Sequence, residues 1–365
     1  MLRPKPNIEK MARPVHGGID AAELERFGFR PEEAIDFSVS VNPFGPPPGI
    51  EKAIAAAAID RYPDSESTQV RESVAKKFDL SADNVIIGSG STELIRLIAM
   101  AYFGPYDLVL IPHPTYGEYD VACDLVGART LKPWMLGEPD FRLDLPRILT
   151  LVEEHRPTGL FLCNPNNPTG EYLSRDTVNS LLYHIGSSIM VMDEAYLAFS
   201  DAPWQSTELL ETGRLIIVRS MTKDFALPGL RLGYALGPKQ LVSTLNRIKP
   251  PWNVSSVAQA AARFALDNDD YVVECGKKVR EAREFLISGL RTLGYRVVPS
   301  SANFFLVKVS DAAAFRQALL AEGLVVRDCA SFGLPTYIRL APRTIPECER
   351  LLAAIDTPEV RGHAG

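Results

Sequence analysis

The chain has 365 residues, 46% of them hydrophobic and 23% charged, which is more than one compact core usually holds and suits two domains. Lysine and arginine number 39 against 45 aspartate and glutamate residues, so the formal net charge is −6 with histidine neutral. A mildly acidic chain without a block of basic residues argues against nucleic acid and against a membrane surface as partners.

The first 45 residues look irregular and lead into a turn-rich stretch. Three prolines in succession, Pro46 to Pro48, cannot lie inside a helix, because proline lacks the amide N–H that a helix interior needs. We therefore interpret residues 1–45 as an N-terminal arm. We expect this arm to pack near the smaller of the two domains.

Residues 46–250 alternate between short apolar runs and amphipathic stretches. The runs are typical of buried strands, and stretches such as 93–101 and 175–183 have helical spacing. This alternation predicts an α/β fold, a large domain whose mostly parallel sheet is flanked by helices on both faces. The predicted strands are 84–88, 108–112, 159–163, 189–193, 215–219 and 232–236.

Pro250-Pro251 interrupts this alternation and marks the predicted end of the large domain. A long helical region is predicted over 257–293, and strands are predicted at 304–309 and 337–340. We expect residues 251–365 to form a smaller α+β domain.

The cysteines and histidines indicate which kinds of site and which compartment to expect. The five cysteines are scattered, odd in number and without a Cys-x-x-Cys pair, which favours a reducing compartment over disulfides or a zinc site. The five histidines show no metal-ligand spacing, so we expect no metal. The first residues lack a signal-peptide core, and no apolar run approaches the roughly 20 residues that span a bilayer. We therefore expect a cytoplasmic protein without a membrane partner.

Polar residues follow the predicted strands at the point where each strand ends. These segments are 88–93, 113–119, 164–170, 193–196 and 220–223. Because the ligand crevice of an open α/β sheet lies at the carboxyl ends of its strands, we expect them to meet around one site.

Lys223 and Asp193 carry the strongest chemical signal in these segments. A lone lysine is usually a surface residue, but an amine directly after a buried strand becomes a nucleophile when burial or a nearby cation depresses its pKa. An aspartate at a strand end can simply cap a helix. It can also keep the nitrogen of a pyridine cofactor protonated.

Two loops complete the set of signals. The Asn-Pro-rich turn 164–170 can position an amide, although such residues also form ordinary loops. The small-residue loop 88–93 opens a predicted helix and is a ready phosphate site. It is not a dinucleotide-binding loop, because position 93 is glutamate where that motif needs glycine.

Together these segments resemble the class I/II (fold type I) aminotransferase family of pyridoxal-phosphate (PLP) enzymes. The resemblance extends from about residue 36 to 343. The motifs that carry it are Asn167-Pro168-Thr169-Gly170, Asp193-x-Ala195-Tyr196, Ser220-x-x-Lys223, and Arg231 eight residues after Lys223. Four linked motifs in the same order are far more specific than any one of them.

The resemblance implies a role for each matching residue. Lys223 binds PLP covalently and moves a proton, Asp193 pairs with the ring nitrogen, and Tyr119 stacks on the ring. Asn167 and Tyr196 bind the ring oxygen. The cofactor phosphate is expected at Gly90, Ser91, Thr92, Ser220 and Arg231, with Tyr62 reaching the phosphate of a neighbouring subunit. This last contact implies a homodimer.

Within the family, the chain resembles threonine-phosphate decarboxylase of cobalamin biosynthesis, and next histidinol-phosphate aminotransferase. His16-Gly17-Gly18 favours the decarboxylase, as do Trp252 and Cys329, whereas Ser40 departs from the asparagine usual there. Two arginines can clamp an anion in a bidentate manner. The expected substrate contacts are His16, Gly17, Ser40, Asn167, Arg327 and Arg339.

The resemblance thus implies a PLP-dependent lyase that decarboxylates L-threonine O-3-phosphate to (R)-1-amino-2-propanol phosphate. The alternative is an aminotransferase that acts on histidinol phosphate or a related amino acid with 2-oxoglutarate. In both cases the substrate is a small phosphorylated, amino-acid-like molecule. A third hypothesis is a non-catalytic PLP-binding regulator, which the presence of Lys223 and Asp193 disfavours.

Overall fold

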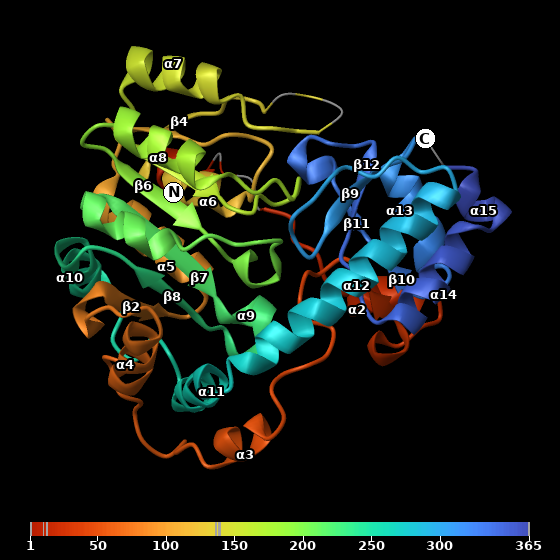
Figure 1. Ribbon diagram of the computed structural model, residues 1–365, viewed down its shortest axis with the longest axis horizontal. Coiled ribbons are helices and arrows are strands. Elements are labelled where there is room, and N and C mark those ends of the chain that lie inside the picture. Colours follow the sequence, from red (N-terminus) through yellow and green to blue (C-terminus); the bar gives the residue numbers. More distant parts are fainter. Residues whose placement is uncertain (1, 10, 12–13, 136, 138–139, 364–365) are drawn as a thin grey trace.

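A seven-stranded sheet forms the centre of the larger body in the computed structural model, which describes residues 2–9, 11, 14–135, 137 and 140–363 (Figure 1). The strand order is β2-β8-β7-β6-β5-β3-β4. Neighbours from β7 to β4 pair in parallel, and β8 runs antiparallel to both of its neighbours. The predicted α/β fold is confirmed. The strands are β2 (Val85–Gly88), β3 (Leu108–Leu110), β4 (Arg129–Leu131), β5 (Gly159–Cys163), β6 (Ile189–Asp193), β7 (Leu215–Ser220) and β8 (Gly233–Leu236).

Side-chain alternation along the strands explains why helices cover both faces of this sheet. In β5, Leu160 and Leu162 pack into the core on one face, while Phe161 and Cys163 pack into the core on the other. Both cores are apolar, so neither face can be left to water. The helices of this body are α3 (Ile50–Ala55), α4 (Thr68–Lys77), α5 (Ser91–Tyr102), α6 (Glu118–Val126), α7 (Leu145–His155), α8 (Arg175–His184), α9 (Met221–Asp224), α10 (Lys239–Ile248) and α11 (Ser256–Asp267).

A smaller body is built on an antiparallel sheet in the order β11-β12-β9. Its apolar core includes Phe305, Phe315 and Ile338. The strands predicted at 304–309 and 337–340 are present as β9 and β12. The elements of this part are α12 (Asp270–Thr292), β9 (Phe305–Lys308), α13 (Ala312–Leu320), β10 (Leu324–Val325), β11 (Arg327–Asp328), β12 (Tyr337–Leu340), α14 (Ile345–Ile355) and α15 (Pro358–Arg361).

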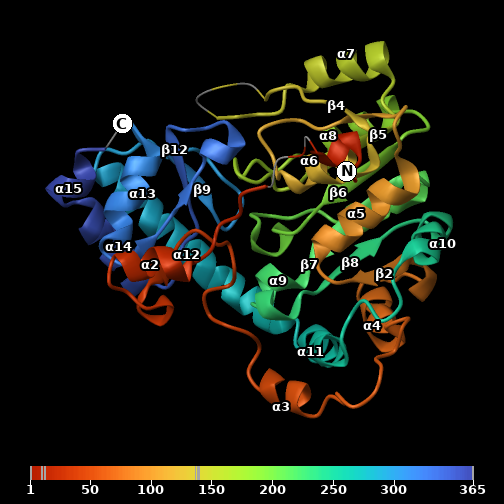
Figure 2. The same cartoon turned by 180° about the vertical axis from the view of Figure 1, so that it is seen from behind.

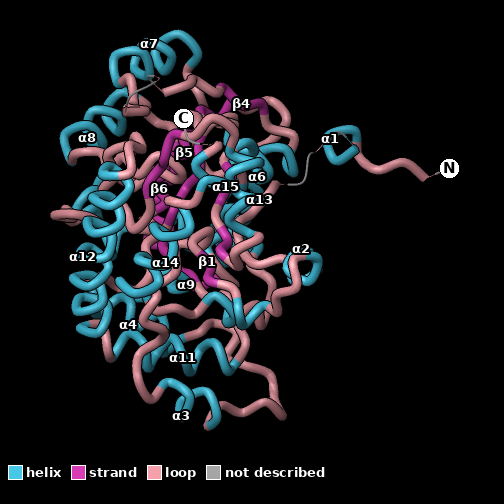
Figure 3. Tube along the Cα trace, turned by 90° about the vertical axis from the view of Figure 1, so that its right-hand side faces the viewer, coloured by secondary structure: helices cyan, strands magenta, loops and turns pink. Residues whose placement is uncertain are grey.

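The N-terminal arm touches both bodies. Its helix α1 (Pro6–Glu9) lies beside α6 of the larger body, whereas α2 (Ala21–Arg26) packs Leu24 against Leu320 and Val325 of the smaller one (Figures 2 and 3). Strand β1 (Ile35–Asp36) then pairs in parallel with β10. The arm therefore runs from one body to the other.

The domain limits drawn from the sequence stay a prediction, and the packing of α11 and α12 suggests a refinement. Ala261 and Ala265 of α11 pack in the core of the large sheet. Helix α12 has Val272 in that same core and Leu286 in the core of the smaller body. Figure 1 shows α12 reaching from one body to the other. We propose that the boundary lies within α12 rather than at residue 250.

Within the described residues, no helix combines the length and the apolar character that crossing a membrane requires.

Candidate active site

A cavity of about 1060 Å³ opens at the carboxyl ends of the parallel strands. Segments scattered along the chain meet there, as the position of polar residues after the strands predicts. Among the residues singled out in the sequence, the cavity is lined by His16, Gly17, Ser40, Ser91, Thr92, Asn167, Asp193, Tyr196, Ser220, Lys223, Arg231, Arg327 and Arg339. Gly90, Tyr119 and Tyr62 do not line it. No group of potential metal ligands occurs among the described residues.

Lys223 lies in the short helix α9, directly after β7. Its carbonyl oxygen accepts a hydrogen bond from the backbone N–H of Asn42, 2.8 Å away, so the N-terminal arm helps to fix it. Burial lowers the pKa of the Lys223 amine to about 8, and the nearby charges of Arg339 and Arg231 act in the same direction. About a tenth of this amine is therefore neutral, and so nucleophilic, at pH 7.

Asp193 ends β6 and is only 3% exposed. Its carboxylate accepts a hydrogen bond from the Tyr119 hydroxyl at 2.8 Å and another from the backbone N–H of Ala195 at 3.0 Å. Burial nevertheless raises its pKa to about 6, because these two bonds offset only part of the lost hydration. A cation placed against this carboxylate would favour its ionised form.

The N-terminus of α5 forms a cradle suited to an anion. Gly90, the N-cap residue, has φ +81° and provides no capping side chain, so the first amides of the helix have no partner from a cap. A Cβ on Gly90 would come within 2.8 Å of the Arg231 guanidinium. A Cβ on Gly233 would come within 2.7 Å of the Ser91 amide. Hydroxyl groups that line the same cavity are those of Thr92, Ser220 and Thr222.

Arg339 connects three parts of the chain at the cavity wall. Its guanidinium donates to the side-chain oxygen of Asn167 and, at 2.7 Å, to the carbonyl of Ser38. The Asn167 amide in turn donates to the Tyr196 hydroxyl at 3.3 Å. Asn167, Tyr196 and Arg339 are therefore held in one hydrogen-bonded row.

Arg327 and Arg339 are buried cations without an acidic partner. Each is 6% exposed, and in the part of the chain that the structure describes neither forms an ion pair with a carboxylate. Arg327 donates only to neutral oxygens, the Val15 carbonyl at 2.8 Å and the Ser331 hydroxyl at 2.6 Å. Buried charges are usually paired, so these two guanidiniums indicate the place of an anionic ligand.

His16 and Gly17 line the cavity, but the histidine already has a partner. Its Nε2 lies 3.0 Å from Oε1 of Glu118, the first residue of α6. No pattern in the sequence indicates Glu118, because a single glutamate in a helical turn is usually a surface residue. The expected contact of His16 with substrate stays a prediction.

Tyr116 lines the cavity, whereas Tyr119 does not. Tyr119 is fully buried, stacks on Phe161 at 5.1 Å between ring centroids, and uses its hydroxyl to bind Asp193. Tyr116 lines the cavity, and burial raises the pKa of its hydroxyl to about 12. We therefore propose Tyr116 as the stacking residue and Tyr119 as the donor that orients Asp193. Two tyrosines three positions apart look alike in sequence, and only burial separates them.

Tyr62 lies outside the cavity of its own chain. It is 75% exposed and stacks on Trp252, which is 47% exposed, with ring centroids 4.3 Å apart. This exposed aromatic pair is compatible with a contact to a second subunit. The role of Tyr62 at a neighbouring site stays a prediction.

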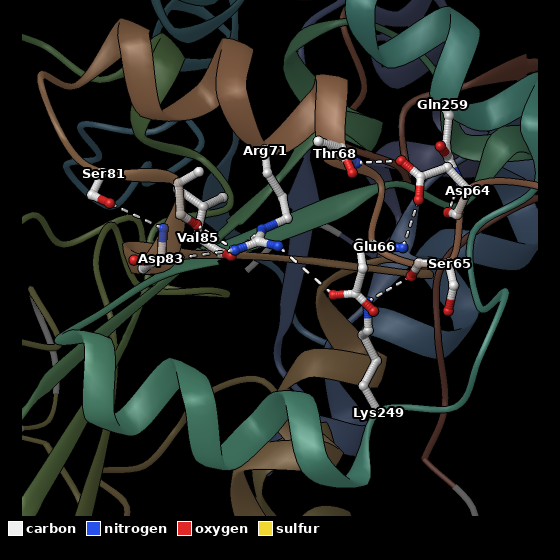
Figure 4. A network of polar contacts seen from close by, with 11 residues as sticks. Asp64, Ser65, Glu66, Thr68, Arg71, Ser81, Asp83, Val85, Lys249 and Gln259 are labelled. Carbon is white, nitrogen blue, oxygen red and sulfur yellow. Dashed lines mark hydrogen bonds and ion pairs between the residues drawn. The ribbon is translucent and has the colours of Figure 1, made fainter.

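A network of polar contacts fixes the segment that follows Tyr62 (Figure 4). The Asp64 carboxylate accepts the backbone N–H of Thr68 at 2.7 Å, at the start of α4. Lys249, at the end of α10, donates to the Ser65 carbonyl at 2.9 Å. Arg71 donates to the Val85 carbonyl at 3.1 Å and so ties α4 to β2. Tyr62 thus projects from a well-anchored segment.

The residues present fit the cofactor that the sequence motifs imply. The uncapped start of α5 with Arg231 suits a phosphate, Asp193 suits a protonated ring nitrogen, and Lys223 provides the amine. Two buried polar atoms without a partner, Ser40 Oγ and Arg339 Nε, belong to residues of the same cavity wall. Buried polar groups normally have partners, so such atoms are explained by a ligand.

Comparisons with known proteins agree with this geometry. The family model described as aminotransferase class I and II matches residues 32–355. The chain is 33% identical over 309 residues to histidinol-phosphate aminotransferase 2 of Carboxydothermus hydrogenoformans, covering 81% of this chain and 84% of that protein. Its structure is similar to histidinol-phosphate aminotransferase of Sinorhizobium meliloti in complex with pyridoxal-5'-phosphate, with TM-score 0.86, 25% identity and coverage of 99% and 98%. It is also similar to L-threonine-O-3-phosphate decarboxylase of Porphyromonas gingivalis, with TM-score 0.77, 26% identity and coverage of 88% and 98%.

The raised pKa of Asp193 predicts a pH dependence of the cofactor-free protein. Its folded value of about 6 exceeds the ordinary 3.8, so the folded state binds the proton more tightly and loses stability as pH rises through this interval. Asp193→Asn removes that titration. In urea unfolding of cofactor-free proteins, the decrease in unfolding free energy between pH 5 and pH 8 should be smaller in the variant by about 1.4 kcal/mol. Asp60→Asn, at a side chain that is 78% exposed, is the control and should behave like wild type. An equal decrease in unfolding free energy between pH 5 and pH 8 for Asp193→Asn and wild type would contradict the prediction.

Proposed function

Because the chain belongs to the aminotransferase class I and II family, we propose that it is a PLP-dependent aminotransferase that moves the amino group of a phosphorylated amine such as histidinol phosphate to 2-oxoglutarate. The observation that carries the substrate class is the pair of buried guanidiniums, Arg327 and Arg339, without acidic partners on the wall that also holds Lys223. The names of the relatives support the transferase over the decarboxylase that the N-terminal motif favoured.

The proposal assigns PLP to the donors described above. Its phosphate would lie at the start of α5 with Arg231, and its ring nitrogen against Asp193. When bound, PLP supplies an electron sink for the substrate α-carbon bond that lies perpendicular to its ring. Asp193 supports this chemistry by keeping its carboxylate ionised against the ring nitrogen, and Tyr119 holds that carboxylate in place.

The chain's own residues then bind the substrate and move its proton. Lys223 Nζ, with its lowered pKa, is suited to take the proton from the substrate α-carbon and return it at the neighbouring position. Arg339 is fixed by Asn167 and Ser38 and would bind a carboxylate. Histidinol phosphate has no carboxylate and carries one anionic group, its phosphate, which Arg327 would bind. 2-Oxoglutarate carries two carboxylates, of which Arg339 would bind one and Arg327 the other. One pair of arginines thus serves both partners of a transamination.

Decarboxylation of L-threonine O-3-phosphate is the second candidate. The observation that favours it is the position of His16 and Gly17 on the cavity wall, where additional donors suit a substrate that carries both a phosphate and a carboxylate. The solved decarboxylase from Porphyromonas gingivalis shares the fold. The number of arginines does not separate the two reactions, because threonine phosphate and 2-oxoglutarate each bring two anionic groups to the site, although histidinol phosphate brings one.

We further propose that the active species is a homodimer in which Tyr62 reaches the cofactor phosphate of the partner. The exposed stack of Tyr62 on Trp252 and the anchored segment behind it support this arrangement. A large exposed aromatic pair on a fixed segment is a common feature of protein interfaces.

Lys223→Ala should lower turnover by at least about two to four orders of magnitude, because the site then lacks its nucleophile and proton carrier. The variant should also lose the visible absorbance that a covalent bond between Nζ and the cofactor gives, while its far-ultraviolet circular dichroism stays unchanged. Lys239→Ala, at a lysine that is 61% exposed, is the control and should retain activity. Substantial multiple-turnover activity of Lys223→Ala would remove Lys223 from the mechanism.

Product analysis separates the two candidate reactions. Wild-type enzyme should form glutamate from histidinol phosphate and 2-oxoglutarate and should release no CO₂ from threonine phosphate, with Lys223→Ala as the blank. CO₂ from threonine phosphate without glutamate from the other mixture would replace the transferase by the decarboxylase. Neither product would reject both.

Tyr62→Phe should weaken cofactor binding by about ten- to a hundredfold, because a hydrogen bond to a charged group contributes roughly 1.5–3 kcal/mol. Tyr106→Phe is the matched control, since Tyr106 is 94% exposed. Sedimentation at assay concentration should show a dimer for both variants. A fully active monomer would contradict the shared site.

A further inference from the structure

Residues 14–18 of the N-terminal arm cross the cavity wall and contact both bodies. Pro14, Val15, His16 and Gly17 line the cavity. On the side of the larger body, His16 contacts Glu118 at 3.0 Å. On the side of the smaller body, the Val15 carbonyl accepts from Arg327 at 2.8 Å. We call residues 14–18 the strap.

The strap also fits closely against Ser38, the residue that holds Arg339. The Gly18 N–H donates to the Ser38 hydroxyl at 2.8 Å, while the Ser38 carbonyl accepts from Arg339 at 2.7 Å. A Cβ on Gly17 would lie 2.8 Å from that same carbonyl oxygen. The approach therefore requires glycine at this position, and the strap contacts one cavity arginine directly and the other through Ser38.

Glu118 is the fixed end of this arrangement. Its side chain is only 4% exposed, and its two oxygens accept separately from His16 at 3.0 Å and from Arg96 at 3.0 Å. These hydrogen bonds hold the pKa of Glu118 below its ordinary value, and the bond from His16 has the larger effect. Arg96 belongs to α5, so the carboxylate is anchored to the helix that begins the anion cradle.

We propose that the strap orients Arg327 for the anionic group of the substrate, and that Glu118 is the positioning residue that fixes the strap through His16. Val15 lies next to His16, so the contact that holds the histidine also sets the position of the carbonyl that Arg327 binds. If the strap is docked in only a fraction of molecules, the apparent affinity for the anion falls by that fraction. The effect on substrate affinity rests on the proposed function; the docking of the strap does not.

Glu118→Gln in the holoenzyme is the first test, because it keeps the shape and removes the charge. Hydrogen exchange of the Gly18 amide should become about three- to tenfold faster, and KM for the phosphorylated amine should rise about three- to tenfold, since a pair with a half-exposed partner contributes modestly. The value of kcat should stay within about twofold, because Glu118 does not reach the reacting atoms. His16→Ala removes the same contact from its exposed side and should give the same result if Glu118→Gln folds poorly.

Glu23→Gln is the matched control. Glu23 also ties the arm to a body, through Arg316 at 2.7 Å, but it does not line the cavity. It should leave Gly18 exchange and KM unchanged. In an Arg327→Ala background, Glu118→Gln should raise KM by less than about twofold, because the residue through which it acts is gone.

Binding of inorganic phosphate, measured by calorimetry, separates a failure of this proposal from a failure of the proposed function. The Kd for inorganic phosphate should rise in Glu118→Gln by about the same factor as KM, whatever the amino substrate is. Unchanged Gly18 exchange in both Glu118→Gln and His16→Ala would overturn the docking role. Faster exchange with unchanged phosphate affinity would overturn the orientation of Arg327.

Discussion

The site depends on ionisable side chains that are buried around one cavity. Burial removes their hydration, and not every cation among them has a carboxylate partner. Burial moves the pKa of Lys223 down and that of Asp193 up, so both groups shift toward their neutral forms. Arg327 and Arg339 cannot respond in this way, because a guanidinium stays protonated in a protein. Among the described residues, these two guanidiniums therefore stay charged without a paired carboxylate until anions enter the cavity. A cofactor phosphate and, under the proposed function, an anionic substrate would supply the missing negative charge, and the fold holds the arginines in place for them.

Rigid hydrogen bonds from distant segments keep these cations in place. Arg339 lies in β12 of the smaller body, yet its guanidinium donates hydrogen bonds to Asn167 of the larger body and to Ser38 of the N-terminal arm. The arm adds the bond from Asn42 to the Lys223 carbonyl. The three parts of the chain thus converge on the same few atoms. A relative movement of the two bodies would therefore change the position of Arg339 with respect to Lys223.

The fold and most of the site follow from local sequence patterns, whereas the partners of the site residues do not. Apolar runs such as 159–163 predict buried strands, and their ends predict where Asp193 and Lys223 meet. Short strands such as β4, with little burial, lack that pattern. The sequence prediction names Tyr119 for the stacking role and does not consider Tyr116, because burial, which separates the two tyrosines, is not visible in the sequence. Glu118 could not be predicted, since its partner His16 is 102 positions away.

The row formed by Asn167, Tyr196 and Arg339 also bears on which substrate bond is cleaved. Asn167 and Tyr196 are expected at the ring oxygen of the cofactor, and Arg339 is bonded directly to Asn167. A substrate carboxylate held by Arg339 would therefore be fixed beside the two residues expected at the cofactor. A carboxylate fixed in this way would not be the group that leaves. Arg339 is buried and bonded on two sides, so it resists the shift that decarboxylation would need. The hydrogen-bonded row therefore favours proton removal, the first requirement of transamination.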